Sequence, residues 1–430
     1  MKRAIVVGSG AGGATVAREL QGAFHVTVVE AGNSFQPFAG NLNMIEKLKK
    51  GPGLFFNEKQ IQWILPTMKI GSSGDGVVLV KGVCQGGSTT LSTGSAVRQD
   101  HDLKAIGIDL DAEFEELARE LPIHTDHEAK WHAPTREAYE VCQKMGLEPH
   151  PTPKMIPGER CTGCGRCTLG CPSGAKWDSR DFLNEAVEKG AEVVSGQAVR
   201  QVVIENGRAT GVVAVNGRRN HLYRGDLVVL AAGGFGTPVI LQQSGIGCQD
   251  SLFVDPVLCV ATKWEKARQD QELPMPFTVQ EEHYMISPYF DFLSFFFNRD
   301  WKYPAGDIFS LMIKLADTNS GSVTPKGARK PLLDVDRARL EEGVRRCREI
   351  LHKLGKGDEN TFLGTLNAGH PGGTLPLTEK ESRTLHHERL PDNLYVADAT
   401  LLPNSLGNPP ILTILALAKR IGRACVEYAK

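Results

Sequence analysis

The sequence predicts an α/β protein built on a parallel, doubly wound sheet, and three observations carry that prediction. The first is a strand–turn–helix–strand unit, in which apolar strands at 4–7 and 26–30 flank a glycine turn and a helix at 14–21. The second is the return of strand-like runs late in the chain, at 227–232 and 394–400. The third is the length of 430 residues, which suits two joined domains with a cofactor cleft between them.

The glycine turn has the pattern of a dinucleotide-binding site. Gly8, Gly10 and Gly13 have the spacing that lets a backbone approach a diphosphate at the start of a helix. Glu30 ends the second strand, about twenty residues further on, where a carboxylate accepts hydrogen bonds from ribose hydroxyls. Such turns also occur where a helix only packs tightly on a strand. The combination of strand, turn, helix and acid favours nucleotide binding.

The later elements follow from periodicity and turn residues. Two Asn-Gly pairs, at 206–207 and 216–217, separate strand-like runs and predict hairpins. The region 255–370 has an aromatic-rich stretch at 284–303 and is expected to form a cap or substrate domain. Further strands are expected at 191–205 and 210–215, and further helices at 111–121, 135–145, 336–354 and 411–428.

Charge and hydropathy exclude several classes of protein. The 49 basic and 50 acidic residues give a formal charge of -1, so no basic field would attract nucleic acid or an anionic membrane. The apolar run before Gly8 is too short for a secretory signal. The apolar run at 411–418 is far shorter than the roughly 18 residues of a spanning helix. We therefore expect a cytoplasmic protein without a transmembrane segment.

Four of the ten cysteines form one tight run. Cys161, Cys164, Cys167 and Cys171, followed by Pro172, have the spacing of bacterial ferredoxins and predict a 4Fe-4S cluster. In two-cluster ferredoxins the fourth cysteine binds the other cluster, so a single cluster would use Cys171 or a remote thiolate such as Cys84. Zinc is an alternative, although zinc sites usually have two widely separated Cys-x-x-Cys pairs. Reduced structural cysteines are the third interpretation.

The aromatic stretch has three interpretations. Its members could fill the core beneath a sheet, line an apolar substrate cavity, or form a docking face for another subunit. The residues are Tyr284, Tyr289, Phe290, Phe292, Phe295, Phe296, Phe297, Trp301 and Tyr303.

Four segments in order resemble the glucose-methanol-choline (GMC) oxidoreductase family. The first is VVGSGAGGATVARELQGAFHVTVVEAG at 6–32, and the second is KGVCQGGSTTLSTG at 81–94. The third is LVVLAAGGFGTPVILQQSGIG at 227–247, and the last is NLYVADATLLPNSLGNPPILTILALAKRIG at 393–422. With 430 residues the chain would be a short member with a reduced cap.

The resemblance implies a Rossmann-like FAD-binding domain with a mixed-sheet substrate (cap) domain, as in GMC and PHBH-like flavoproteins. The expected parts are a discontinuous FAD-binding domain at 1–110, 190–250 and 390–430, a cysteine-rich insertion at 150–182, and a cap at 251–389. Besides the first glycine turn and Glu30, it implies FAD contacts from Gly86, Gly87, Ser88, Ala232, Asp398 and Pro409.

The resemblance also implies a catalytic pair, His370 in the segment His370-Pro371-Gly372-Gly373-Thr374 and Asn408 before Pro409. Removing a hydroxyl proton as hydride leaves for a flavin suits a neutral imidazole. An amide can hydrogen-bond the substrate oxygen without competing for that proton. The closing helix would point its positive end at the flavin.

Together these features predict an FAD-dependent dehydrogenase that converts an alcohol to a carbonyl, or the reverse. An iron–sulfur cluster accepts single electrons, so it would connect the flavin to an external electron carrier or partner redox subunit rather than to oxygen. Two alternatives stay open. One is an oxidase that delivers electrons to oxygen without a cluster, and the other is an electron-transfer subunit in which flavin and cluster only relay electrons.

Overall fold

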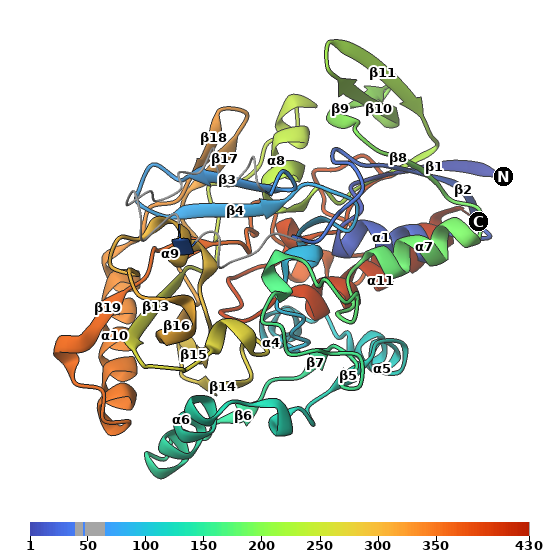
Figure 1. Cartoon of the computed structure of the whole chain (residues 1–430). Helices are drawn as coiled ribbons and strands as arrows, with labels where there is room; N and C mark the ends of the chain where they lie inside the picture. The colour runs from blue at the N-terminus through green and yellow to red at the C-terminus, as the bar shows by residue number, and fades with distance from the viewer. Residues whose placement is uncertain (39–45, 48–64, 430) are drawn as a thin grey trace.

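The computed structural model describes residues 1–38, 46–47 and 65–429, and its first feature is a five-stranded parallel sheet (Figure 1). The strand order is β21-β12-β1-β2-β8, with parallel pairing throughout. Its strands are β1 (Lys2–Val7), β2 (Phe24–Val29), β8 (Glu192–Val194), β12 (Leu227–Leu230) and β21 (Leu394–Val396). The sheet confirms the predicted α/β class, and it unites segments from both ends of the chain.

Three helices pack together beside this sheet. Helix α1 contacts both α7 and α11, and Figure 1 shows the three running side by side. Apolar residues of α1 are fully buried against the strands, including Val16 and Ala17. The helices are α1 (Ala11–Glu19), α4 (His101–Ala105), α5 (Asp111–Glu120), α6 (Ala133–Lys144), α7 (Arg180–Glu188), α8 (Gly233–Gln243), α9 (Phe292–Phe297), α10 (Asp334–Lys353) and α11 (Ile411–Ala429).

A three-stranded antiparallel sheet packs against the parallel one. Strands β9 (Ala198–Glu205), β10 (Arg208–Asn216) and β11 (Arg219–Arg224) pair through two hairpins. In the first turn both Asn206 and Gly207 have positive φ, as an Asn-Gly hairpin predicts, and in the second turn Gly217 has positive φ. Strand β10 contacts β12, and β11 contacts β1. The connection between β8 and β12 is therefore made by hairpins instead of a helix.

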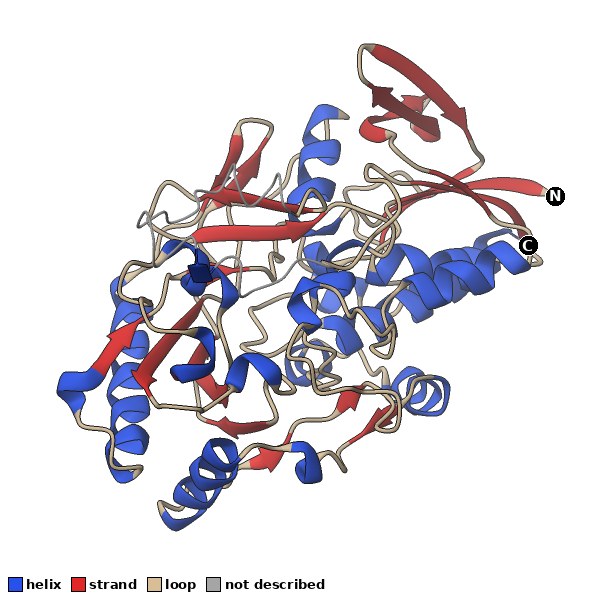
Figure 2. Ribbon diagram, viewed as in Figure 1, coloured by secondary structure: helices blue, strands red, loops and turns tan. Residues whose placement is uncertain are grey.

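The second large unit is a nine-stranded mixed sheet, visible in Figure 2 beside the long helix α10. Its order is β3-β4-β20-β13-β16-β15-β14-β6, and β19 pairs with β13. The β20–β4 pair is parallel and the other pairs are antiparallel. Its strands are β3 (Met68–Ser72), β4 (Val78–Gly82), β6 (His150–Pro151), β13 (Val257–Lys263), β14 (Phe277–Gln280), β15 (Tyr284–Pro288), β16 (Ile308–Leu315), β19 (Thr361–Leu363) and β20 (Asn367–Ala368).

The two units share chain segments. Strands β3, β4 and β6 come from outside the predicted cap range 251–389, yet they pair into the cap sheet. Two small sheets complete the strands, β5 (Ile123–His124) with β7 (Lys154–Met155) and β17 (Ser322–Thr324) with β18 (Gly327–Arg329). The exact domain boundaries stay a prediction.

The aromatic stretch lies mainly in the core of the cap. Phe290, Phe295 and Trp301 are buried together in one apolar cluster with residues of β13 and β16. Within the described residues, no helix combines the length and apolar character that crossing a membrane requires.

Candidate active site

The glycine turn connects β1 to α1 in the way the sequence predicts. Gly8 has a φ of +96°, and a Cβ atom there would lie 2.4 Å from the Ala231 carbonyl oxygen. A Cβ atom on Gly13 would lie 2.0 Å from the Gly8 carbonyl oxygen. Neither position accepts a side chain, because a real Cβ atom never comes so close to backbone. Gly10 caps the N-terminus of α1.

Glu30 ends β2 directly beside this turn. Its carboxylate accepts hydrogen bonds from the Ser9 amide (2.9 Å), the Ser9 hydroxyl (2.7 Å) and the Gly32 amide (2.8 Å). Burial raises the pKa of Glu30, and these hydrogen bonds oppose the rise. A carboxylate has about four lone-pair positions, so one stays available for a hydroxyl donor.

The segment Gly86-Gly87-Ser88 lies against the first glycine turn. The Gly86 amide donates to the Ser9 hydroxyl at 3.2 Å, and a Cβ atom on Gly87 would lie 2.9 Å from the Gly10 Cα. The Ser88 hydroxyl accepts from the Gly82 amide at 3.0 Å. Two stretches of bare backbone therefore face each other, and the 3-10 helix η1 (Gly87–Leu91) begins between them.

The C-terminal segment reaches the same place. A Cβ atom on Gly12 would lie 1.6 Å from the Ala397 carbonyl oxygen, so α1 begins directly against the end of β21. The next residue, Asp398, is buried and accepts hydrogen bonds from the Gly233 amide (2.8 Å) and the Thr237 hydroxyl (2.5 Å). Burial raises its pKa. Ala232 donates its amide to the same Thr237 hydroxyl, at 3.0 Å.

These segments fit an FAD molecule. The amide-rich start of α1 suits a diphosphate, the Glu30 carboxylate suits a ribose, and bare glycine backbone allows close approach. Three segments that are far apart in the sequence would supply these groups. The individual contacts to Gly86, Ser88 and Asp398 remain predictions.

A cavity with a mostly apolar lining lies between the segment that follows η1 and the cap sheet. Its polar lining contains His370, Asp255, Lys314, Asn367 and Thr93. Its apolar lining includes Met68, Val80, Leu91, Leu169, Val257, Met275, Phe292, Leu293, Phe296, Met312 and Ile411.

His370 has one edge of its ring buried and the other open to this cavity. About a third of its side chain (33%) is exposed, while Nδ1 is buried and lies 3.4 Å from Asp255 Oδ2. Asp255 in turn pairs with Lys314 at 2.7 Å, and both side chains are buried. Burial and the nearby Lys314 charge lower the pKa of His370, against the opposing effect of Asp255. The imidazole is therefore neutral at neutral pH and able to accept a proton.

Asn408 is buried, and its amide nitrogen donates to Gln280 Oε1 at 2.9 Å. The next residue, Pro409, lines the cavity, as does Ile411 at the start of α11. The structure thus brings His370 and the segment containing Asn408 to one cavity, while the Asn408 side chain bonds to strand β14.

The four cysteines lie on one irregular segment around the 3-10 helix η3 (Cys167–Leu169). Cys167 is buried, and the other three are partly exposed. Burial raises the pKa of Cys167 to about 12, whereas hydrogen bonds from Ser173 and nearby amides outweigh burial and lower the pKa of Cys171. Among the residues that the structure describes, no group of three or more His, Cys, Asp or Glu side chains is placed to hold a metal ion.

Several polar residues at the site have no motif in the sequence. Asp255 and Lys314 lie next to His370, and Lys176 is a buried ammonium group beneath η1. Lys314 alone gave a local signal, because it interrupts the apolar strand IFSLMIKL and a buried lysine needs a partner.

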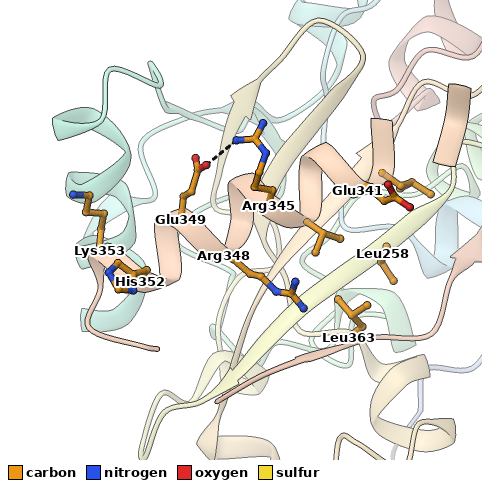
Figure 3. A pocket seen from close by; sticks show the side chains of 10 residues that line it. Leu258, Glu341, Arg345, Arg348, Glu349, His352, Lys353 and Leu363 are labelled. Carbon is orange, nitrogen blue, oxygen red and sulfur yellow. Dashed lines mark hydrogen bonds and ion pairs between the residues drawn. The ribbon is translucent and has the colours of Figure 1, made fainter. Parts of the chain in front are cut away.

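A second hollow, between α10 and strands β13 and β19, is separate from these groups (Figure 3). Figure 3 shows Arg348 extending from α10 toward the strands that carry Leu258 and Leu363. Arg345 and Glu349 on the same helix form an ion pair of 2.7 Å. None of the predicted site residues lines this hollow.

Comparison with known proteins places the chain in one group. A family model described as GMC oxidoreductase matches residues 4–260. An uncharacterised protein of Methanocaldococcus jannaschii is 26% identical over 97% of this chain and 98% of its own length. An uncharacterised GMC-type oxidoreductase of Sinorhizobium fredii is 25% identical over 99% of this chain and 95% of its own. The crystal structure of pyridoxine 4-oxidase from Mesorbium loti is similar with a TM-score of 0.74 at 18% identity, covering 98% of this chain and 99% of that one.

Proposed function

Because the chain belongs to the GMC oxidoreductase family, we propose that it uses FAD to oxidise the CH–OH group of a small apolar alcohol to a carbonyl, with His370 as the base. The observation that carries this proposal is the His370 ring, which opens onto an apolar cavity next to the segments that fit FAD. The reaction is reversible in principle, so a carbonyl compound is the substrate of the opposite direction.

In this mechanism the FAD, when bound, supplies the acceptor for the hydride from the alcohol carbon. His370 takes the hydroxyl proton at Nε2, since its Nδ1 edge is buried against Asp255. The lowered pKa of His370 keeps the ring in its neutral, proton-accepting form at neutral pH. The apolar lining excludes water, which strengthens polar interactions inside the cavity.

The lining of the cavity indicates the substrate class. Phe292, Phe296, Leu293 and Met312 present apolar surface. No arginine is among the described lining residues, and the lysine there, Lys314, is already paired with Asp255 at 2.7 Å. An alcohol with an apolar body therefore fits better than a sugar or a charged substrate.

Asn408 is the second proposed contact to the substrate oxygen. Its amide nitrogen bonds to Gln280, so the carbonyl oxygen or a rotated amide would have to serve the substrate. Pro409 beside it lines the cavity and fixes the backbone at that point.

The identity of the electron acceptor decides whether the enzyme is a dehydrogenase, which passes electrons to another carrier, or an oxidase, which passes them to oxygen. A 4Fe-4S cluster held by Cys161, Cys164, Cys167 and Cys171 would favour the dehydrogenase. Supporting this part, the cysteine segment lies close to η1, because Lys176 Nζ bonds both to the Cys167 carbonyl and to carbonyls of η1. The cluster is tested by measuring the iron and sulfide content of anaerobically purified protein. Protein that is fully active but contains neither iron nor sulfide would exclude the cluster.

Replacing His370 by alanine tests the function as a whole. We expect anaerobic flavin reduction by alcohol to slow by about 10²- to 10⁴-fold, with FAD retained. An electron-transfer subunit would instead keep its dye-coupled electron transfer and show no alcohol-dependent step to lose. Peroxide formation under air would identify an oxidase.

A further inference from the structure

The dipeptide Val254-Asp255 contacts His370 through both its backbone and its side chain. The His370 amide donates to the Val254 carbonyl at 3.3 Å, and His370 Nδ1 lies 3.4 Å from Asp255 Oδ2. Within the described part of the chain, no group makes a well-aligned hydrogen bond to Nδ1 of His370. The acceptor that lies nearest to this nitrogen is the Asp255 carboxylate.

The backbone at Asp255 is held in a conformation that side chains rarely adopt. Its φ is +51°, in the left-handed region. The Asp317 carboxylate accepts the amide hydrogens of Val254 (3.1 Å) and Asp255 (2.8 Å), and Asp317 pairs with the fully buried Lys330 at 2.8 Å. A second buried ion pair thus fixes this dipeptide, and residues held in such a backbone conformation cluster at functional sites.

Lys314 keeps the Asp255 carboxylate in its charged form. Burial raises the pKa of Asp255, but the charge of Lys314 and the contact with His370 outweigh burial and lower it to about 2. A carboxylate only accepts hydrogen bonds, so the imidazole nitrogen facing it must carry the hydrogen. The lone pair then lies on Nε2, on the cavity side.

Asp255 also contacts the loop that carries the second proposed site residue. The Ser405 hydroxyl donates a short hydrogen bond to Asp255 Oδ1, and it accepts the Asp317 amide at 3.1 Å. Ser405 precedes Asn408 by three residues. The Asp255 carboxylate therefore contacts both His370 and the loop that leads to Asn408.

We propose that Asp255 is a positioning residue, which fixes His370 as the Nδ1–H tautomer and aligns the Ser405–Pro409 loop with it. This inference rests on the proposed function of His370. A purely structural ion pair between Asp255 and Lys314 is the competing account.

Nitrogen NMR of the holoenzyme with isotope-labelled histidine tests the tautomer directly, with the His370→Ala spectrum assigning the signal. We expect wild-type His370 to carry its hydrogen on Nδ1. In Asp255→Asn/Lys314→Met, which removes both charges and keeps a side chain tolerant of the left-handed backbone, we expect a mixed tautomer. Flavin reduction should slow on the order of 10²- to 10⁴-fold with little change in substrate affinity.

Two further variants complete the test. Lys314→Met removes the charge that lowers the pKa of His370, so it should move the acidic limb of the rate profile to higher pH. Glu272→Gln neutralises a different buried carboxylate, which accepts from the His132 amide and Thr135, and it should change neither tautomer nor rate.

Wild-type protein with hydrogen on Nε2 would overturn the proposal, and this result requires no variant to fold. An unchanged tautomer and rate in the double variant would overturn it as well. If instead His370→Ala still reduces its flavin with alcohol at the normal rate, the proposed function fails, and that failure is separate from the tautomer result.

Discussion

At the scale of single residues, His370 differs from an ordinary loop histidine in what surrounds its ring. One edge lies against a buried ion pair and the other faces an apolar cavity. The loop sequence around His370 indicated the residue, through its resemblance to a family motif. The partners could not be predicted, because Asp255, just before β13, and Lys314, in β16, are far from His370 in the sequence and meet it only after folding.

The pH dependence of flavin reduction follows from the lowered pKa of His370. Burial and the Lys314 charge lower it below the ordinary histidine value of about 6.5. The reduction rate should therefore be constant through neutral pH and fall as the pH drops through the lowered pKa, because protonated imidazole is no base. Stopped-flow measurements across the acidic range check this, and a decline that begins above the ordinary value would contradict it.

Asn408 and Gln280 form a matched pair for testing the second proposed contact. If the Asn408 amide binds the substrate oxygen, Asn408→Ala should slow flavin reduction about 10²- to 10³-fold, as loss of such a donor does. Gln280→Ala removes the same 2.9 Å hydrogen bond from the other side and should have a much smaller effect. Equal losses in both variants would mean that Asn408 has only a structural role.

At the scale of elements, Lys176 joins the cysteine segment at 161–171 to the 3-10 helix η1. Its buried ammonium group donates to the carbonyls of Thr89 (3.0 Å), Thr90 (2.8 Å), Ser92 (2.9 Å) and Cys167 (3.2 Å). These four acceptors are backbone carbonyls, and the Ser92 hydroxyl is a further acceptor at 3.4 Å. The contacts hold η1 and η3 together next to the cavity.

Lys176→Met should therefore destabilise η1 and the residues that follow it, because their carbonyls lose a hydrogen-bond donor. Carbonyls left without donors cost about 1–3 kcal/mol of unfolding free energy, and we expect a lower Tm and faster release of FAD. Lys189→Met, at the exposed end of α7, is the control and should stay within about 0.5 kcal/mol of wild type. Calorimetry and flavin fluorescence measure both effects. Equal behaviour of the two variants would contradict the role given to Lys176.

Local elements could be predicted well where one pattern dominates. The hairpins at the two Asn-Gly turns and the helices α5, α10 and α11 lie within a few residues of their expected ranges. The pairing of β3, β4 and β6 into the cap sheet could not be predicted, because the sequence of a short strand does not specify which distant strand it pairs with. The cysteine spacing likewise indicates a cluster, whereas the described residues hold no metal-binding group of three or more side chains.

At the scale of the whole molecule, the proposed FAD site connects three distant parts of the chain. The turn at 8–13, the segment 86–88 and the residues 397–398 meet at the start of α1. The C-terminal helix is attached at the other end of α1, since buried Lys419 pairs with Glu120 of α5 at 2.7 Å and with Glu19, the last residue of α1, at 3.3 Å. Bound FAD would therefore stabilise the fold as one unit.

Thermal unfolding with and without FAD tests this coupling. A ligand at about 100 times its dissociation constant adds about 2.7 kcal/mol to the stability of the folded state. The holoenzyme should accordingly unfold at a higher temperature in a single transition. An unchanged Tm with saturating FAD would contradict the linkage between the three segments.

The visible absorption spectrum of anaerobic protein, before and after addition of apolar primary and secondary alcohols, tests the central claim most directly. The account predicts stoichiometric oxidised FAD that is bleached by at least one such alcohol in the wild type and not in His370→Ala. A chain that binds no FAD, or that holds FAD which dithionite reduces and no alcohol does, would contradict it.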